Sequence, residues 1–218
     1  MKRYLSTLLL FTAISGNLGA ALVTIKPSSP IAIPADFDGV FLDFAGDLST
    51  VNVSNSTPPS FDLNFFFGGL GIVDGASMEL VRTGIGGPAA ELGAGATVSV
   101  ASTFDAALSV SGGPVGDPFA HVGTGPDQFK PNSFGYLGFA YDPASSGTPT
   151  YGFFQVIFTD GSGPGAITAW RFQSVAGTPI TISSIPEPAT WITIFGVLVL
   201  AGLVVLRKFK ATKGSGKV

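Results

Sequence analysis

The sequence contains no cysteine and only one histidine, His121. The lack of cysteine excludes disulfides, thiol nucleophiles, cysteine-ligated zinc and iron–sulfur clusters, and a single histidine excludes sites built from several imidazoles. Charge is also scarce, because 11% of the 218 residues are charged while 45% are hydrophobic. A soluble domain usually carries about 25% charged residues. The chain is therefore either membrane-associated or covered by uncharged polar and small side chains.

The few charges are unevenly distributed along the chain. The formal net charge is −3, yet positions 22–185 carry thirteen acidic and four basic residues, a balance of −9, and both ends are positive. A region at −9 repels phosphates, so no nucleic-acid partner is expected. Glycine (30) and proline (16) are abundant without reaching low complexity, and 19 phenylalanines supply enough bulk for a core.

The N-terminus has the pattern of a secretory signal. Lys2 and Arg3 precede an apolar run at 4–14, and the small residues Gly19, Ala20 and Ala21 follow. This order of a positive start, a short apolar region and a small-residue site predicts a signal peptide at 1–21, which signal peptidase removes after Ala21. Cleavage after Ala20 is the alternative. The apolar run is too short to span a bilayer comfortably.

A second apolar segment lies near the C-terminus. Residues 189–206 contain no charge, and as a helix they would extend about 27 Å, which is enough for a thin hydrocarbon core. A basic tail follows at 207–218, with Arg207, Lys208 and Lys210 at its start. The positive-inside rule predicts a single transmembrane helix whose tail stays in the cytoplasm, so that the rest of the chain lies outside the inner membrane.

Pro186-Glu187-Pro188 stands directly before this segment. The order of Pro-Glu-Pro, one apolar helix and a basic C-terminal tail resembles the PEP-CTERM sorting signal of proteins exported by Gram-negative bacteria. The resemblance implies processing by exosortase, a transpeptidase-like membrane enzyme that would recognise the three motif residues and cut nearby while the basic tail retains the chain. Two prolines keep the backbone extended, which is the form that a protease-like groove binds. The motif residues would thus be recognised and would catalyse nothing.

Short apolar or alternating runs fill the region between the two ends. They are separated by Gly, Pro, Asp and Ser clusters, which predicts an all-β chain: a single β-sandwich or jelly-roll-like ectodomain at 22–185, with serine and threonine on the solvent face. The expected strands are 39–45, 49–54, 60–67, 78–82, 97–103, 107–111, 134–141, 151–159, 166–173 and 180–183.

A weaker resemblance concerns the last part of this region. The segments GYLGF at 135–139, YGFFQV at 151–156 and ITAW at 167–170 look like a pattern that precedes the sorting signal in many PEP-CTERM ectodomains. Phe153 stands where tryptophan is commoner. The resemblance implies a β-rich surface domain and brings no catalytic residue with it.

Few residues suggest a chemical site. Asp36 and Asp38, before Gly39, have the alternating spacing of a calcium loop, but the third acid of that pattern is missing and an Asp-rich turn is the alternative. His121 has no nucleophile elbow to serve, so we expect an ordinary residue. No cofactor is expected.

Aromatic clusters at 65–67 and 151–158 favour core packing, with a sugar-stacking surface as the alternative. We therefore weigh three functions. The first is a non-enzymatic cell-surface or matrix protein, associated with exopolysaccharide or the envelope. The second is a carbohydrate-binding module that uses exposed aromatics such as Tyr151 or Phe153, and the weakest is a polysaccharide hydrolase. The expected partners are the inner membrane, signal peptidase, an exosortase-like enzyme and exopolysaccharide.

Overall fold

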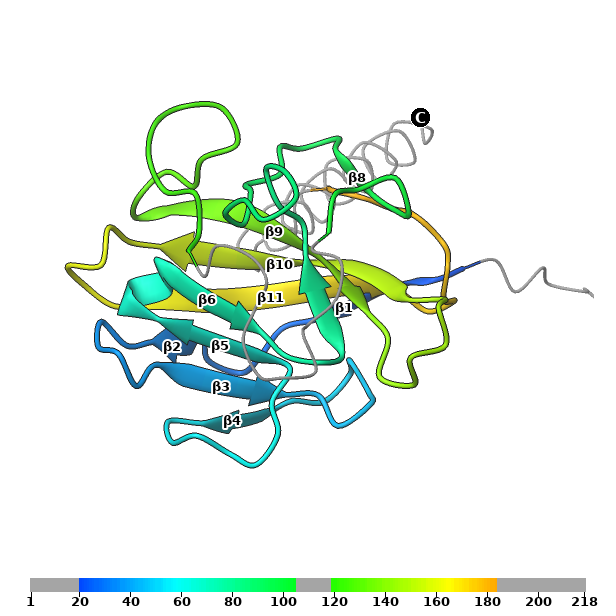
Figure 1. Ribbon diagram of the computed structural model, residues 1–218, viewed down its shortest axis with the longest axis horizontal. Helices are drawn as coiled ribbons and strands as arrows, with labels where there is room; N and C mark the ends of the chain where they lie inside the picture. The colour runs from blue at the N-terminus through cyan, green and yellow to red at the C-terminus, as the bar shows by residue number, and fades with distance from the viewer. Residues whose placement is uncertain (1–19, 105–118, 184–218) are drawn as a thin grey trace, which may run out of the picture.

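The computed structural model describes residues 20–104 and 119–183. Across these ranges the chain is all-β, and every pair of named strands is antiparallel (Figure 1). The helical element of the described chain is one 3₁₀ turn, η1 (Phe67–Gly69). The all-β prediction is confirmed. The signal region before Ala20, the expected strand 107–111 and the sorting segment 186–218 lie outside the described residues.

The larger sheet has six strands and contains the three longest ones. Its order is β1-β11-β10-β9-β7, and β2 also pairs with β11. These two short strands share the edge of β11, since β1 pairs near its end and β2 near its start. The strands of this sheet are β1 (Leu22–Ile25), β2 (Ile31–Ile33), β7 (Met78–Leu80), β9 (Ser133–Tyr141), β10 (Thr150–Phe158) and β11 (Gly165–Gln173).

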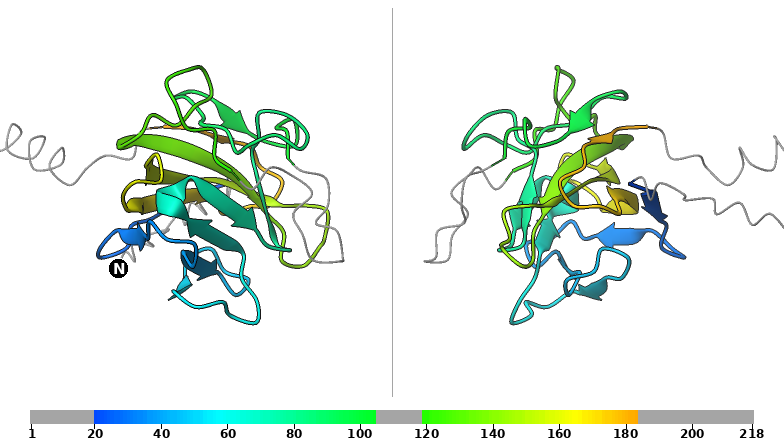
Figure 2. Two further views of the ribbon diagram at one scale, coloured as in Figure 1. Left: turned by 60° about the vertical axis from the view of Figure 1, so that its left-hand side comes forward. Right: turned by 90° about the vertical axis from the view of Figure 1, so that its right-hand side faces the viewer.

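A four-stranded sheet packs against one face of the larger sheet, as the views in Figure 2 show. Its order is β4-β3-β5-β6, made by β3 (Val40–Asp43), β4 (Asn52–Ser54), β5 (Leu63–Phe66) and β6 (Gly71–Asp74). Fully buried side chains of both sheets form one hydrophobic cluster, and the rings of Phe65 and Phe158 meet across it at 6.0 Å. The two layers therefore share a core in the manner of a β-sandwich.

The other face of the larger sheet is covered as well. A two-stranded ribbon of β8 (Thr97–Val98) and β12 (Ile180–Thr181) closes a second hydrophobic cluster there, around Tyr151, Phe153 and Ala169. As a result, seven of the nine residues of β10 are buried. The expected solvent face of serine and threonine is thus wrong for the central strands, which are covered on both sides and read as continuous apolar runs.

Strand predictions are accurate in the centre and poor at the edges. The expected 134–141, 151–159 and 166–173 match β9, β10 and β11 to within one residue. The expected strand 97–103 ends at Val98, because Ser99 and Ser102 bond each other's backbone and close a turn. The prediction missed β1, β2 and β6, which are short and owe their pairing to distant strands or a tight hairpin.

Candidate functional site

An open pocket of about 200 Å³ lies where the central strands of the larger sheet end. Three segments line it: residues 46–48 after β3, the turn between β9 and β10, and the end of β11 with Ser174. Its volume is below the roughly 300–1,000 Å³ of pockets that enclose drug-sized ligands. The pocket is therefore too small to enclose a drug-sized ligand.

The loop after β3 forms one wall and is fixed by three hydrogen bonds. The Phe44 N–H donates to Asp62 Oδ2 at 2.7 Å, the Gly46 N–H donates to the Tyr141 hydroxyl at 2.9 Å, and Trp170 Nε1–H donates to the Leu48 carbonyl at 2.7 Å. The Phe44 ring is fully buried and meets the rings of Tyr141 and Trp170. Partners from both sheets thus hold this wall in place.

Burial and neighbouring acids raise the pKa of Tyr141, with burial as the larger cause. Burial, together with the negative charges of Asp62, Asp43 and Asp47, raises the pKa of Tyr141 to about 12. Burial is also the main reason why the pKa of Asp62 is raised. Tyr141 therefore stays protonated at neutral pH, and its hydroxyl acts in hydrogen bonding rather than as a base.

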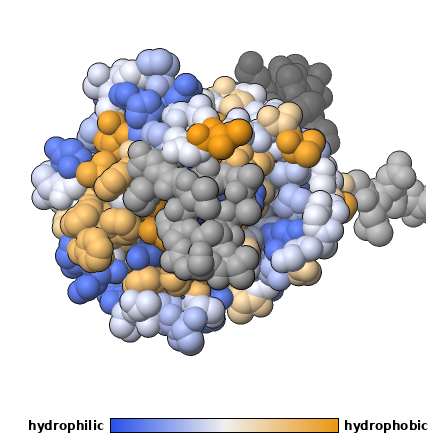
Figure 3. Space-filling view, viewed as in Figure 1, coloured by the Kyte–Doolittle hydropathy of each residue, from blue (hydrophilic) through white to orange (hydrophobic). Residues whose placement is uncertain are grey.

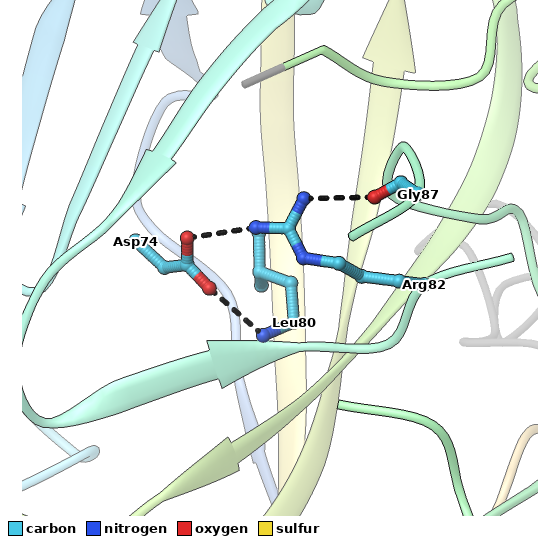
Figure 4. A network of polar contacts seen from close by, with 4 residues as sticks. All are labelled: Asp74, Leu80, Arg82 and Gly87. Atoms are coloured by element: carbon cyan, nitrogen blue, oxygen red, sulfur yellow. Dashed lines mark hydrogen bonds and ion pairs between the residues drawn. The ribbon is translucent and has the colours of Figure 1, made fainter. Parts of the chain in front are cut away.

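A second polar network lies at the turn between β6 and β7 (Figure 4). The Arg82 Nη2 atom donates to Asp74 Oδ1 at 2.9 Å, and Nη1 donates to the Gly87 carbonyl at 3.2 Å. The second carboxylate oxygen of Asp74 accepts the Leu80 N–H at 3.3 Å. Both charged side chains are almost completely buried. The network joins the turn to the glycine-rich loop after β7, and its burial makes it a structural link rather than a ligand site.

The calcium candidates lie on the loop between β2 and β3. Asp36 Oδ1 accepts the Gly39 N–H at 3.0 Å, and Gly39 has a left-handed backbone with φ of 67°. The Asp36 carboxylate thus caps a local turn by bonding the backbone N–H three residues on, which is a structural role that Asp often has in turns. Within residues 20–104 and 119–183 no group of three or more His, Asp or Glu side chains is close enough to hold a metal ion. Asp36 and Asp38 therefore stay a sequence prediction only, and we build no metal site on them.

The predicted sugar-stacking role of Tyr151 and Phe153 is wrong, because both side chains are buried. Tyr151 is 3% exposed and Phe153 is fully buried, both beneath the β8–β12 ribbon. Phe65 is also fully buried. Because they lie in the two cores, none of them offers a ring face to a ligand. The default interpretation of these clusters as core packing is correct for all three.

Sequence reasoning missed the most exposed aromatic residue of the described chain, Phe37. Its side chain is 73% exposed and packs on Phe66 and Phe67, with ring centroids 5.6 and 5.8 Å away. The signal was present in the sequence as an apolar residue between two acids, in a segment that we interpreted as a calcium loop or an Asp-rich turn, without considering the ring itself. A phenylalanine in such a polar turn points to a surface ring.

His121 is half-buried and forms a hydrogen bond with the nearby Gln128. Gln128 Oε1 accepts the Gly125 N–H at 2.8 Å, so the Gln128 amide donates to His121 Nε2, which lies 2.8 Å from its nitrogen. Among the described residues, no serine forms a hydrogen bond with this ring. The expected ordinary role of His121 agrees with this arrangement.

The predicted sorting and export residues lie at or beyond the ends of the described chain. Pro186, Glu187, Pro188, Arg207, Lys208 and Lys210 are outside it. Ala21 is inside, where its N–H donates to Ser174 Oγ at 2.9 Å and its carbonyl accepts the Ser174 N–H. At the other end, Arg171 Nη1 donates to Ser183 Oγ at 2.8 Å. Both ends are thus held close to the end of β11, by Ser174 directly after it and by Arg171 within it, on one side of the molecule in the right-hand view of Figure 2.

Among the described residues, no helix has both the length and the apolar character needed to cross a membrane. The expected transmembrane segment 189–206 lies outside them.

Comparison with known proteins gives no relative. No protein-family model, no curated protein and no solved structure matches this chain.

Proposed function

We propose that the chain is an exported, non-enzymatic surface or matrix protein that is sorted and processed through its C-terminal segment. The observation that carries the proposal is the order of Pro186-Glu187-Pro188, the uncharged run 189–206 and the basic tail 207–218, which resembles a PEP-CTERM signal. A signal peptide at 1–21 would export the chain. The transmembrane helix would then hold it in the inner membrane until an exosortase-like enzyme releases or transfers the domain to the cell surface or the exterior.

The described fold supports this arrangement in two ways. Ser183, whose hydroxyl accepts a hydrogen bond from Arg171 of β11, precedes Pro186 by three positions, so the sorting motif follows the folded domain closely along the sequence. In addition, Leu22, the first residue after the expected cleavage site, pairs with Gln173 at the end of β11, and Ser183 accepts a hydrogen bond from Arg171 of the same strand. A domain with both ends on one side can be tethered to a membrane by either end without rearranging its core. Its finer architecture would be a sandwich of the jelly-roll kind between a signal helix and a membrane helix.

The test compares the wild-type chain with Glu187→Ala and with a deletion of residues 209–218. We expect the wild type to lose residues 1–21 and to be cut near Pro186. We expect Glu187→Ala to accumulate uncut in the membrane fraction, and the deletion variant, which lacks three of the five basic residues of the tail, to be retained there less well. Intact mass of the protein from each cell fraction gives both cleavage sites. Asp160→Asn, which neutralises an exposed acid in the loop between β10 and β11, is the matched control. Unchanged processing and location of both variants would contradict the sorting proposal.

The second candidate function is a carbohydrate-binding surface module. Tyr151 and Phe153 are buried and cannot contact a sugar. The ring of Phe37 is exposed, however, and this observation favours a carbohydrate-binding surface. Such a module is compatible with the first proposal, since a protein held at the cell surface can bind exopolysaccharide there.

A further inference from the structure

We propose that Phe37, with the carboxylates of Asp36 and Asp38 beside it, is a contact site for a neutral polysaccharide. We call this site the Phe37 knuckle; it comprises Asp36, Phe37 and Asp38, with Phe66 and Phe67 behind them. The inference deepens the carbohydrate-binding candidate and does not depend on the sorting proposal.

Three aromatic rings meet at the surface of the knuckle. Phe37 lies against Phe66 and Phe67, whose own centroids are 5.3 Å apart in a T-shaped arrangement. Phe66 is 8% exposed and Phe67 is intermediate, so the two inner rings support the outer one. Figure 3 shows apolar side chains gathered on the left side of the molecule, over η1 and the β2–β3 loop. A single exposed apolar residue needs no explanation, but a supported cluster of rings does.

The backbone around the knuckle is fixed before any ligand arrives. The Phe67 N–H donates to the Asp36 carbonyl at 3.0 Å, and the Gly68 N–H donates to the Pro34 carbonyl at 2.8 Å. Phe67 itself has φ of 49°, a left-handed conformation that is strained for a bulky residue. This strained residue places its ring behind Phe37. A ring that is already held in place loses little entropy when a ligand stacks on it.

The chemistry of the knuckle matches a sugar. An aromatic face packs on the C–H face of a pyranose, and carboxylate oxygens accept hydrogen bonds from its hydroxyls. Asp36, Phe37 and Asp38 are consecutive and all exposed, so two carboxylates accompany the ring at the surface, although Asp36 Oδ1 already accepts the Gly39 N–H. Repeated sugar units along one polymer would engage many copies of the protein and raise the avidity of a weak single contact.

Charge and size disfavour the other occupants. An anionic lipid surface or an anionic polymer would meet two carboxylates at the contact. A second copy in a two-fold contact would bring its own acids against these, because such an interface joins the same patch of both copies. A protein partner needs about 1,200 Å² of buried surface, far more than one ring supplies. A neutral polysaccharide meets none of these costs.

The position of the knuckle leaves it free of the chain ends. The knuckle adjoins η1, which lies near the start of β11, because the Gly68 carbonyl accepts the N–H of Thr159 in the loop that precedes this strand. Ala21 and Ser183, in contrast, are bound near the end of β11. A nine-residue strand spans roughly 27 Å. The knuckle therefore lies away from the end by which a membrane segment would hold the domain.

The experiment is native affinity electrophoresis of the full-length chain in mild detergent. Gels contain hydroxyethyl cellulose, dextran or galactomannan, with alginate as the anionic comparison. We expect at least one neutral polymer to retard the wild type, Phe37→Ala to weaken this retardation at least tenfold, and Phe37→Trp to keep it. Phe134→Ala is the matched control, because Phe134 is 50% exposed and lies on β9, outside the knuckle. Equal melting temperatures of the two alanine variants show that both are folded.

Four results would overturn the proposal. The first is that none of the three neutral polymers retards the wild type, and the second is that the wild type and Phe37→Ala are retarded equally. The third is that the protein binds vesicles of phosphatidylcholine and phosphatidylglycerol, and not a neutral polymer, in a way that depends on Phe37. The fourth is a Phe37-dependent dimer in analytical ultracentrifugation. None of these measurements uses processing at Glu187, so failure here is distinguishable from failure of the sorting proposal.

Discussion

Arg82 and Asp74 form an ion pair 2.9 Å long whose side chains are only 2% and 5% exposed. The pair connects the end of β6 with the loop that follows β7, and it also fixes the Leu80 N–H and the Gly87 carbonyl. A buried pair of this kind costs desolvation, so its main effect is to specify one geometry for the turn.

We expect Asp74→Ala to lower the free energy of unfolding by about 3–5 kcal/mol, because it leaves the buried Arg82 charge without its carboxylate. The double variant Asp74→Leu/Arg82→Met should be closer to the wild type than the single variant is. Urea denaturation followed by circular dichroism measures both. A single variant as stable as the wild type would show that the pair is not a buried link.

The pH dependence of stability should contain a contribution from Asp62. Burial raises its pKa in the folded state above the value in the unfolded chain, so the folded state holds the proton more tightly. The free energy of unfolding therefore falls as pH rises from about 3.9, the usual pKa of Asp, through the raised pKa. Asp62→Asn should remove this fall. Asp47→Asn is the control, because hydrogen bonds from Ser49 lower the pKa of Asp47 and its contribution to stability therefore changes with pH in the opposite direction.

Tyr141 should contribute an alkaline counterpart. Its folded-state pKa of about 12 exceeds the ordinary value of 10, so the folded state keeps the phenolic proton longer than the unfolded state does. Stability should fall as pH rises from 10 to 12, and Tyr141→Phe should flatten that fall. Spectrophotometric titration of the phenolic groups checks the assignment, because the variant would lack the last tyrosine to ionise.

Two left-handed glycines provide a test of local crowding. Gly39 and Gly46 have φ of 67° and 87°, but a Cβ at position 39 would lie 2.3 Å from the Phe65 carbonyl oxygen, whereas nothing lies within 4 Å of one at position 46. Gly46→Ala should cost about 1 kcal/mol from backbone strain alone, and Gly39→Ala clearly more, since the sheet must shift. Similar thermal melting of the two variants would contradict this difference.

The β8–β12 ribbon should contribute to stability although each strand has two residues. Ile180 is 1% exposed in the outer hydrophobic cluster, and its neighbour Thr181 is exposed. Ile180→Ala should cost about 2–4 kcal/mol, and Thr181→Ala less than about 0.5 kcal/mol. Guanidinium denaturation distinguishes the two, and equal losses would mean that the ribbon does not close the cluster.

Local sequence patterns were sufficient for the long strands. The run 151–158 predicts β10 because it is apolar and bounded by turn residues, and GYLGF and ITAW mark β9 and β11 in the same way. No local pattern could find β1 or β2, since each is stable only by pairing with β11, which lies far along the chain. The same limit applies to Tyr151 and Phe153, whose burial depends on a ribbon that includes residues 97–98 and 180–181.

By itself, the sequence determined the all-β class, the absence of thiol and multi-histidine chemistry, the acidic middle and the positive ends, because these depend only on composition and local order. The tertiary structure decided which aromatic rings reach solvent. Phe37 and Phe153 are the same residue type, yet one is 73% exposed and the other fully buried. The difference arises because a sheet covered on both faces hides most side chains of its central strands, whereas a turn fixed by Asp36 and Phe67 holds its ring outward.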